Sequence, residues 1–398
     1  MKKKWLPVLL AAAMTVSLAA CSAAATGTSQ QAASETAATQ EAQQAASETA
    51  TTQEAQQAAS EAETAQTEET TAGEKRVFTD SVGREVEVDA KIERVAISGP
   101  LAQIVVFALA PDKLVGIANE WDPRAEQYLD TKYYNLTLLG QLYGGKGELN
   151  LEELLSVAPQ VVIDVGEPKG TIVEDLDALQ EQTGIPFVHV TATISTMDEA
   201  YTMLGDLLGM EDEAAELAAY CRQAYDDTLA IAGRAEKVNL LYITGEQGLN
   251  VIAKSSYHAE VIDMLSNNLA EVDEPSAKGS GNEVDMEQIL NWNPDVIIFS
   301  PDSIYDTVDT LDEWQTITAI QNGEYYEVPF GPYNWMGFPP SVQRILGMQW
   351  MAKLLYPEEA DYDLYEVAAE YFELFYHCDL SGEQFEELVE HSLQIDAE

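Results

Sequence analysis

An internal near repeat limits the folds open to this chain more than any other feature. Two segments, Asn150–Ile163 and Asp285–Ile298, each begin with a residue favoured at a helix N-cap, carry a glutamate in the first turn, and reach a proline seven residues after that glutamate. The branched apolar run after each proline is typical of a buried strand. Two such copies predict an α/β fold made of two lobes of related design.

The segment between the copies predicts how the lobes are joined. Ile185–Val190 is expected to be the last strand of the first lobe, and Met197–Gly209 a helix closed by its glycine. From Glu211 to Arg234, apolar residues recur at helical spacing, with acids at the start and an arginine at the end. This pattern predicts one helix of about 24 residues, roughly 36 Å long. The second lobe is expected to start with a strand at Val238–Ile243.

The folded part is expected to begin at Val77, where the composition changes abruptly. Val77–Asp80 and Arg84–Val88 alternate like two short strands around a turn. The strand, helix and strand that follow are expected at Arg94–Ile97, Leu101–Leu109 and Leu114–Ile117.

Residues 1–21 are typical of an export signal. Met1–Lys4 supply positive charge, and Leu6–Ala20 form an apolar run that is short for a membrane span. The run ends in Leu-Ala-Ala before Cys21, which resembles the lipobox of bacterial lipoproteins, where the cysteine is acylated. A lipid there would tether the chain to the outer face of a membrane. The alternative is an ordinary cleaved signal with an incidental cysteine.

Residues 22–76 predict a disordered stalk. They contain almost only Ala, Thr, Gln, Glu and Ser, and one short motif recurs at Gln30, Gln43 and Gln56, a period of 13 residues. Without branched or aromatic side chains, this segment cannot offset its ordering entropy by burial.

The charge and cysteine content exclude several classes of protein. The chain has 20 Lys and Arg against 69 Asp and Glu, a formal net charge of −49, which excludes electrostatic binding to nucleic acid or to an anionic membrane. Three cysteines cannot form a disulfide framework or a four-cysteine zinc site.

From Val77 to about Asp379 the chain resembles the substrate-binding lipoproteins of bacterial ABC importers, in particular those for iron chelates, haem and cobalamin. Besides the two repeats and the linking helix, the resemblance is carried by Thr79–Val86, Pro111–Gly116, Tyr333–Trp335 and Pro339–Ser341. It implies two α/β lobes joined by one helix, with a ligand cleft between them. The expected organisation is a signal (1–21), a stalk (22–76), a first lobe (77–196), linking helices (197–236) and a second lobe with C-terminal helices (237–398).

The resemblance also implies a function. We expect a monomeric extracytoplasmic receptor, anchored by lipid, that performs no catalysis, needs no cofactor or metal of its own, and delivers its ligand to an ABC permease and its ATPase. One acid from each lobe should meet arginines of the permease, and by motif position these acids are Glu152 and Glu287. Each lies in the first turn of its expected helix, so the alternative is that both only stabilise the helix dipole.

Ligands of open α/β sheets bind beyond the carboxyl ends of the strands. Residues in or near the loops expected there are the candidate ligand contacts: Ser98, Gly99, Trp121, Tyr143, Lys169, Tyr257, His258, Tyr333, Trp335 and Arg344.

Tyr333 and Trp335 are the strongest of these candidates. The final strand is expected at Val328–Phe330 and the next helix near Pro339, which places both aromatics in an irregular loop. Their alternative role is to plug their own lobe. Arg344, expected one turn into that helix, could pair with a ligand anion or with an internal acid.

The sequence leaves two kinds of ligand open, and one other class of protein is an alternative to a receptor. An iron chelate, haem or corrinoid should favour the aromatic side chains, whereas molybdate or tungstate, bound by some members of this fold, should favour Arg344 and backbone N–H groups. The competing class is an extracytoplasmic hydrolase, but no nucleophile and base occur in a pattern that supports one.

Overall fold

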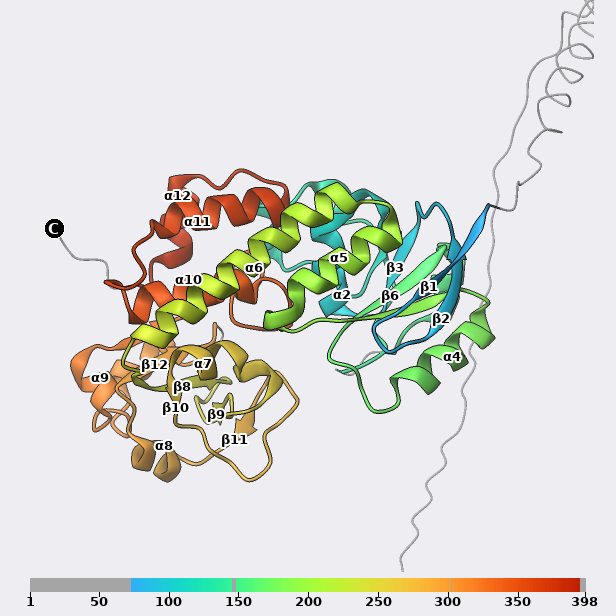
Figure 1. Ribbon diagram of the computed structural model, residues 1–398. Helices are drawn as coiled ribbons and strands as arrows, with labels where there is room; N and C mark the ends of the chain where they lie inside the picture. Colours follow the sequence, from blue (N-terminus) through green and yellow to red (C-terminus); the bar gives the residue numbers. More distant parts are fainter. Residues whose placement is uncertain (1–72, 145–147, 302, 394–398) are drawn as a thin grey trace, which may run out of the picture. The chain divides into compact units, whose positions relative to one another are not determined.

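The structure is a computed structural model that describes residues 73–144, 148–301 and 303–393 (Figure 1). By its internal contacts the chain divides into two units, Met1–Thr71 and Ala72–Glu398. The expected signal, Cys21 and nearly all of the expected stalk therefore lie outside the described residues.

The first lobe is built on a parallel sheet. β3 (Val95–Ile97), β6 (Val161–Gly166) and β7 (Phe187–Thr191) pair in the order β3-β6-β7. A bridge from Val95 to Leu114 ties β3 to the neighbouring pair β4 (Gly116–Ile117) and β5 (Thr137–Leu138). The helices of this lobe are α2 (Pro100–Leu109), α3 (Leu151–Ser156) and α4 (Ile172–Thr183).

The expected hairpin is present at the start of the first lobe. β1 (Lys75–Thr79) pairs antiparallel with β2 (Glu85–Asp89), and Phe78, Val86 and Val88 point into the core. β1 begins two residues before the expected start at Val77, because Lys75 still pairs in register with Asp89 and forms an ion pair with it.

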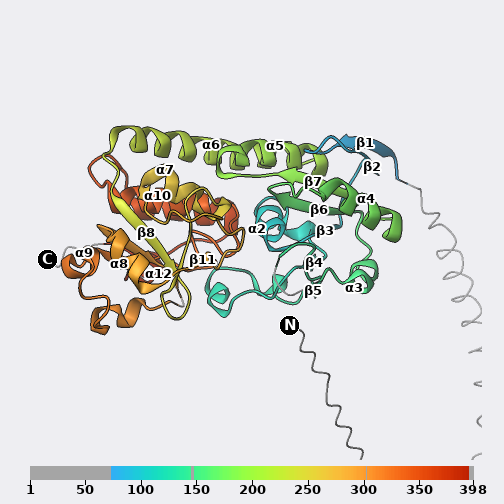
Figure 2. The same ribbon diagram turned by 90° about the horizontal axis from the view of Figure 1, so that it is seen from below.

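Two helices connect the lobes where the sequence predicts them. α5 (Met197–Leu208) ends at Gly209, which adopts the left-handed conformation with φ of 64°. α6 (Glu211–Arg234) buries the stripe of Ala214, Leu217, Cys221, Ala224, Thr228 and Ile231. In Figure 2, α5 and α6 run along one side of the two lobes.

The second lobe contains a mixed sheet with strands in the order β11-β9-β8-β12-β13, and β10 also pairs with β8. Its strands are β8 (Asn239–Thr244), β9 (Asn250–Val251), β10 (Asn267–Asn268), β11 (Asn282–Glu283), β12 (Val296–Phe299) and β13 (Tyr325–Glu327). Its helices are α7 (Glu260–Leu265), α8 (Met286–Trp292) and α9 (Thr318–Asn322), followed by α10 (Arg344–Leu355), α11 (Leu364–Tyr371) and α12 (Gly382–Val389).

The near repeat gives the same unit in both lobes. Asn150 and Asp285 cap α3 and α8 with side-chain oxygens that accept backbone N–H groups of the first turn. α3 leads into β6 and α8 into β12, and each of these strands lies between two parallel neighbours. Both strands are buried along their whole length, as expected for inner strands of a parallel sheet.

The lobes share a hydrophobic core as well as the linking helix. One apolar cluster runs from β2, β3 and α2 through α5 and α6 to α10, α11 and the strands of the second lobe. α10 packs on α6 and α7, and η7 (Phe372–Tyr376), a short π-helix, packs on α2 of the first lobe. The C-terminal helices thus form a second connection between the lobes.

Two expected boundaries are wrong, both at prolines. The final strand is Tyr325–Glu327 rather than 328–330, because Pro329 has no N–H group and cannot continue the ladder. The helix expected near Pro339 begins only at Arg344, so that Arg344 is its first residue. A proline disfavours helical geometry in the residue before it, and two consecutive prolines, Pro339 and Pro340, delay the helix.

Candidate functional site

The two strongest candidates, Trp335 and Tyr333, and the further candidate Trp121 lie in or against the core shared by the lobes. Trp335 is 0% exposed, and its Nε1 donates to the Gly331 carbonyl over 3.1 Å. Tyr333 accepts a hydrogen bond from Gln103 Nε2 of the first lobe at 3.3 Å. Trp121 is also buried, with its ring centre 5.8 Å from that of Tyr333. Tyr333 therefore contacts the first lobe through Gln103 and Trp121, and Trp335 exposes no surface to a ligand in this conformation.

Ser98, Gly99 and Tyr143 all lie in the first lobe, where Ser98 and Tyr143 each hydrogen-bond to an acid. The Ser98 hydroxyl donates to Asp164 on β6, and the other carboxylate oxygen of Asp164 lies 2.7 Å from His189 Nδ1 on β7. Tyr143 donates to Asp175 over 2.7 Å. Gly99 is the N-cap residue of α2. The Ser98 hydroxyl is therefore already engaged within its own lobe.

Arg344 and Tyr257 form an internal arrangement between the lobes. Arg344 is 1% exposed, and its Nη2 lies 2.9 Å from Glu260 Oε2. Its Nη1 donates to the Tyr257 carbonyl over 2.8 Å, and its guanidinium lies over the Tyr257 ring at 4.6 Å from the centroid. The Tyr257 hydroxyl in turn donates to the Ala192 carbonyl of the first lobe over 2.9 Å. Arg344 thus pairs with an internal acid, which is one of the two roles that the sequence left open for it.

Lys169 and His258 lie near each other although they come from different lobes. Burial is the main cause that lowers the pKa of His258 to about 4, and the positive charges of Arg344 and Lys169 add to this effect. His258 is therefore neutral at neutral pH. Lys169 is exposed, on the loop between β6 and α4, and its amino group remains accessible to solvent. The exposed ring of Phe338 lies close to His258, since a Cβ added at Gly279 would be 2.9 Å from the one and 3.2 Å from the other.

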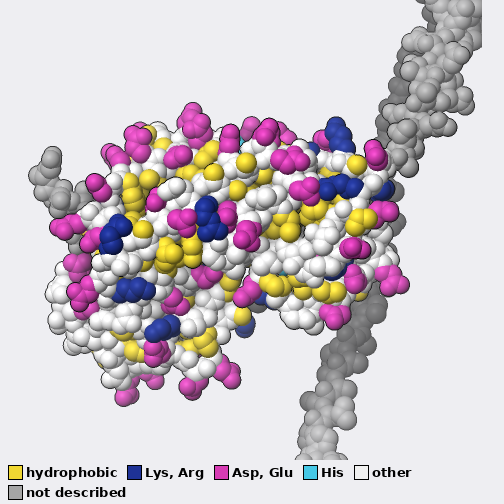
Figure 3. All heavy atoms as spheres, in the orientation of Figure 1, with side chains coloured by type: hydrophobic (Ala, Val, Ile, Leu, Met, Phe, Trp, Pro, Cys, Tyr) yellow, Lys and Arg dark blue, Asp and Glu magenta, His cyan; other side chains and the backbone are white. Residues whose placement is uncertain are grey.

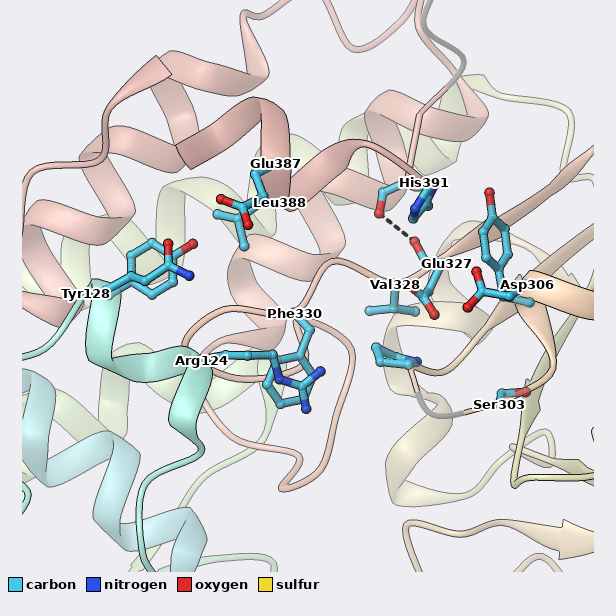
Figure 4. Close-up of a pocket in the computed structure, with 14 residues that line it drawn as sticks. Arg124, Tyr128, Ser303, Asp306, Glu327, Val328, Phe330, Glu387, Leu388 and His391 are labelled. Atoms are coloured by element: carbon cyan, nitrogen blue, oxygen red, sulfur yellow. Dashed lines mark hydrogen bonds between the residues drawn. The ribbon is translucent and has the colours of Figure 1, made fainter. Parts of the chain in front are cut away.

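A cavity of about 390 Å³ lies between residues of the two lobes (Figure 4). The turn η2 (Pro123–Gln127) of the first lobe faces the loops after β12 and β13, and α12 with the residues after it completes the wall. Its charged and aromatic lining comprises Arg124, Tyr128, Tyr305, Asp306, Glu327, Phe330, Glu387 and His391. The cavity therefore lies beyond the carboxyl ends of two parallel strands, where ligands of open sheets bind.

The geometry of the lining combines one guanidinium with aromatic rings. Arg124 lies over the Phe330 ring, 3.4 Å from its centroid, and forms an ion pair with Asp122 at 2.9 Å. The Tyr305 and His391 rings are 5.2 Å apart. Burial is the main cause that raises the pKa of Tyr128 and of Tyr305 to about 12. Both phenols are therefore neutral hydrogen-bonding groups at neutral pH.

The sequence predictions missed Arg124, Tyr305 and Phe330. Arg124 lies three residues after the candidate Trp121, and Phe330 three residues before the candidate Tyr333. Tyr305 follows a strand that the repeat does predict, so the loop after Val296–Phe299 was the available signal. The strand-end rule thus predicts the edge of the sheets at which this cavity lies, but not the residues that line it.

The two candidate docking acids are exposed on matching helices. Glu152 follows the N-cap Asn150 of α3, and Glu287 lies two residues after the N-cap Asp285 of α8. In Figure 2, α3 and α8 both lie away from the side of the lobes along which α5 and α6 run.

Two classes of feature are not found in the described part of the chain. None of its helices is both long and apolar enough to cross a membrane. No group of three His, Cys, Asp or Glu side chains among the described residues could hold a metal ion.

On the face shown in Figure 3, acidic side chains are spread over both lobes.

Comparison with known proteins identifies the family. The model of the family described as periplasmic binding protein matches residues 99–331. A solute-binding protein of an ABC transporter from Sulfurospirillum deleyianum is 26% identical, with a TM-score of 0.73, 79% of this chain and 98% of that chain covered. A periplasmic solute-binding protein from Veillonella parvula is also 26% identical, with a TM-score of 0.65, 80% of this chain and 98% of that chain covered.

A curated relative has a named solute. The molybdate-binding protein MolA of Haemophilus influenzae is 23% identical in an alignment of 337 residues that covers 76% of this chain and 91% of MolA.

Two α/β lobes with a cavity between them define a receptor that binds a solute without transforming it. The chain belongs to the periplasmic binding protein family. It is an extracytoplasmic solute-binding protein of an ABC transporter, it is not an enzyme, and it carries no cofactor other than the solute it binds. Its partners are a small-molecule ligand and a permease.

Proposed function

We propose that this receptor captures a neutral or cationic metal chelate, such as a ferric hydroxamate or a corrinoid, in the cavity between the lobes. The observation that carries the proposal is the cavity of about 390 Å³, whose mainly polar lining includes the rings of Tyr128, Tyr305 and Phe330. Its volume lies in the range of about 300–1,000 Å³ typical of sites for organic ligands. A tetrahedral oxyanion would leave most of this space empty.

The charges of the lining favour the same class. Three carboxylates, those of Asp306, Glu327 and Glu387, line the cavity together with one guanidinium, that of Arg124. A negative charge on the ligand that faces these carboxylates, away from water, would cost several kcal/mol of binding free energy. The excess of carboxylates in the lining therefore disfavours haem, which carries two propionates, and highly charged catecholate complexes. Aromatic faces, by contrast, supply contact area to any flat or apolar ligand.

Molybdate or tungstate is the second candidate, favoured by the similarity to MolA. Such a ligand needs cations or N–H groups with free hydrogen-bonding capacity. The cation expected to serve it, Arg344, forms an ion pair with Glu260 and donates from Nη1 to the Tyr257 carbonyl, but its buried Nε and Nη2 have no hydrogen-bond partner. Arg344 therefore keeps free N–H donors for an oxyanion, and the exposed Lys169 is a second cation that could serve it.

Replacing Phe330 by alanine should weaken chelate binding by about 1–3 kcal/mol, because the cavity loses the ring and the support that this ring gives the stacked Arg124 guanidinium. Arg124→Gln should weaken binding of an anionic chelate more than that of a neutral one. Phe385→Ala is the matched control, since Phe385 is a half-buried aromatic outside the cavity. Calorimetric titration of each variant measures the change. Wild-type affinity in Phe330→Ala would place the chelate elsewhere.

We also propose that a lipid on Cys21 anchors the receptor, and that the permease works with an ATPase. Support for the anchor comes from the basic start, the short apolar run and the small residues before Cys21. Changing Cys21 to serine should move the protein from the membrane fraction to the soluble fraction. Unchanged membrane retention of that variant would contradict the anchor.

For the permease we propose docking through Glu152 and Glu287. The support is their exposure and their matched positions on α3 and α8. A two-fold permease presents equivalent surfaces to the two lobes, so a matched pair of acids suits it.

A further inference from the structure

The two copies of the repeat share an exposed leucine that the fold does not require. Leu155 on α3 is 50% exposed, and Leu290 on α8 is 39% exposed. They occupy the same position in the two copies, three residues after Glu152 and Glu287. In each helix the preceding residue, Leu154 or Ile289, is fully buried and fixes the helix on its lobe.

The helical spacing places each leucine beside its acid. Residues three apart lie on the same face of a helix, so Leu155 lies next to Glu152, and Leu290 next to Glu287. The residue four positions after each acid, Ser156 or Asn291, is also exposed and polar. Each lobe therefore presents the same small surface: an acid, a leucine and a short polar side chain.

A single exposed leucine is ordinary on a protein surface and needs no explanation. Two at one register of a repeat, each beside an exposed acid, are a different observation. The lobes otherwise differ in these helices, since Glu153 corresponds to Gln288 and Ser156 to Asn291. The acid and the exposed leucine are thus the surface features that both copies keep.

We propose that Leu155 and Leu290 are apolar anchors of the permease-docking surface, one on each half of the two-fold permease. Each permease half then presents an apolar depression beside a cation, which complements the leucine and its neighbouring acid. The inference rests on the proposed docking of Glu152 and Glu287. Partner binding also explains why these side chains are leucine at positions open to water.

The two kinds of contact should act on different steps of docking. Charges at an interface mainly accelerate encounter and are screened by salt. Burial of an apolar side chain is not screened and mainly slows dissociation. The leucines should therefore hold the complex that the acids steer into place.

The test is the double variant Leu155→Gln and Leu290→Gln, which keeps helix propensity and side-chain length. We expect about a tenfold loss of permease affinity for each leucine, through faster dissociation and independent of salt. Leu229→Gln is the matched control, because Leu229 is a leucine of α6 with 49% exposure. Binding is measured by surface plasmon resonance, at low and high salt, on the permease that the wild-type chain serves, reconstituted in nanodiscs.

Two results would overturn the inference, and each says something different about the docking itself. If reversal of Glu152 and Glu287 abolishes binding but the leucine double variant binds like Leu229→Gln, docking at these helices stands without apolar anchors. If neither the acid reversal nor the leucine change affects binding, the permease docks elsewhere. Far-UV circular dichroism and thermal unfolding of every variant, compared with the wild type, separate either outcome from loss of the receptor fold.

Discussion

Reversal of both Glu152 and Glu287 to lysine is expected to abolish solute uptake while the purified protein keeps its solute affinity. Facing like charges at an interface cost several kcal/mol, so two reversals should lower permease affinity more than 100-fold. Both side chains are exposed, and the fold should lose only the few tenths of a kcal/mol that each acid contributes at a helix start. Uptake of labelled solute by cells, together with calorimetry on the purified variant, measures the two effects.

The same two helices provide the control for this experiment. Glu153 and Gln288 each follow the docking acid by one residue, about 100° further around the helix. Lysine at these two positions changes the local charge without reversing the proposed contacts, and uptake should stay within a few-fold of the wild type. Equal loss of uptake in both double variants would show that general charge, not the two acids, controls docking.

The second large effect should follow from truncation of Trp335. Replacing Trp335 by alanine should lower the free energy of unfolding by about 3–5 kcal/mol, the usual cost of emptying the space of a large core aromatic. Its ring is fully buried, its Nε1 is hydrogen-bonded, and its backbone carbonyl lies so close to Gly347 that a Cβ there would be 2.0 Å away. Urea unfolding of the purified protein measures the change.

Phe338 serves as the control for the same loop. It lies three residues after Trp335 but is 44% exposed, so Phe338→Ala should cost well under half as much stability. The account would be contradicted if Trp335→Ala left stability unchanged and weakened solute binding. In that case Trp335 would contact the solute, as the sequence alone suggested.

The parts of the fold that the sequence predicts correctly are those encoded by local patterns. The helical spacing of Ala214 to Ile231 defines α6 to the residue, and the capping residues with the proline spacing define the two repeats. The turn at Ser81–Gly83 likewise predicts the first hairpin. Each of these signals lies within a few dozen consecutive residues.

The details of the site depend on contacts between distant parts of the chain. Arg344 finds its acid partner in Glu260, and Tyr333 is fixed by Gln103 of the other lobe. An aromatic side chain in a loop can face either a ligand or a neighbouring helix. The residues next to it in the sequence do not distinguish these two cases. The burial of Trp335 therefore could not be read from the residues around it.

The cavity illustrates the same limit. Arg124 and Phe330 are separated by about two hundred residues and meet only because η2 of one lobe approaches the loop after β13 of the other. The strand-end rule favours residues next to both segments, Trp121 and Tyr333, but which side chains line a space depends on how the lobes pack. The matched positions of Glu152 and Glu287, in contrast, follow directly from the repeat.

The measurement that tests the account most directly is native mass spectrometry of the wild-type protein, incubated separately with a ferric hydroxamate, a corrinoid, haem, a ferric catecholate and molybdate. The account predicts a 1:1 complex with the ferric hydroxamate or the corrinoid, and none with molybdate. A stable 1:1 complex with molybdate, without binding of any chelate, would contradict the proposed ligand class and favour an oxyanion receptor.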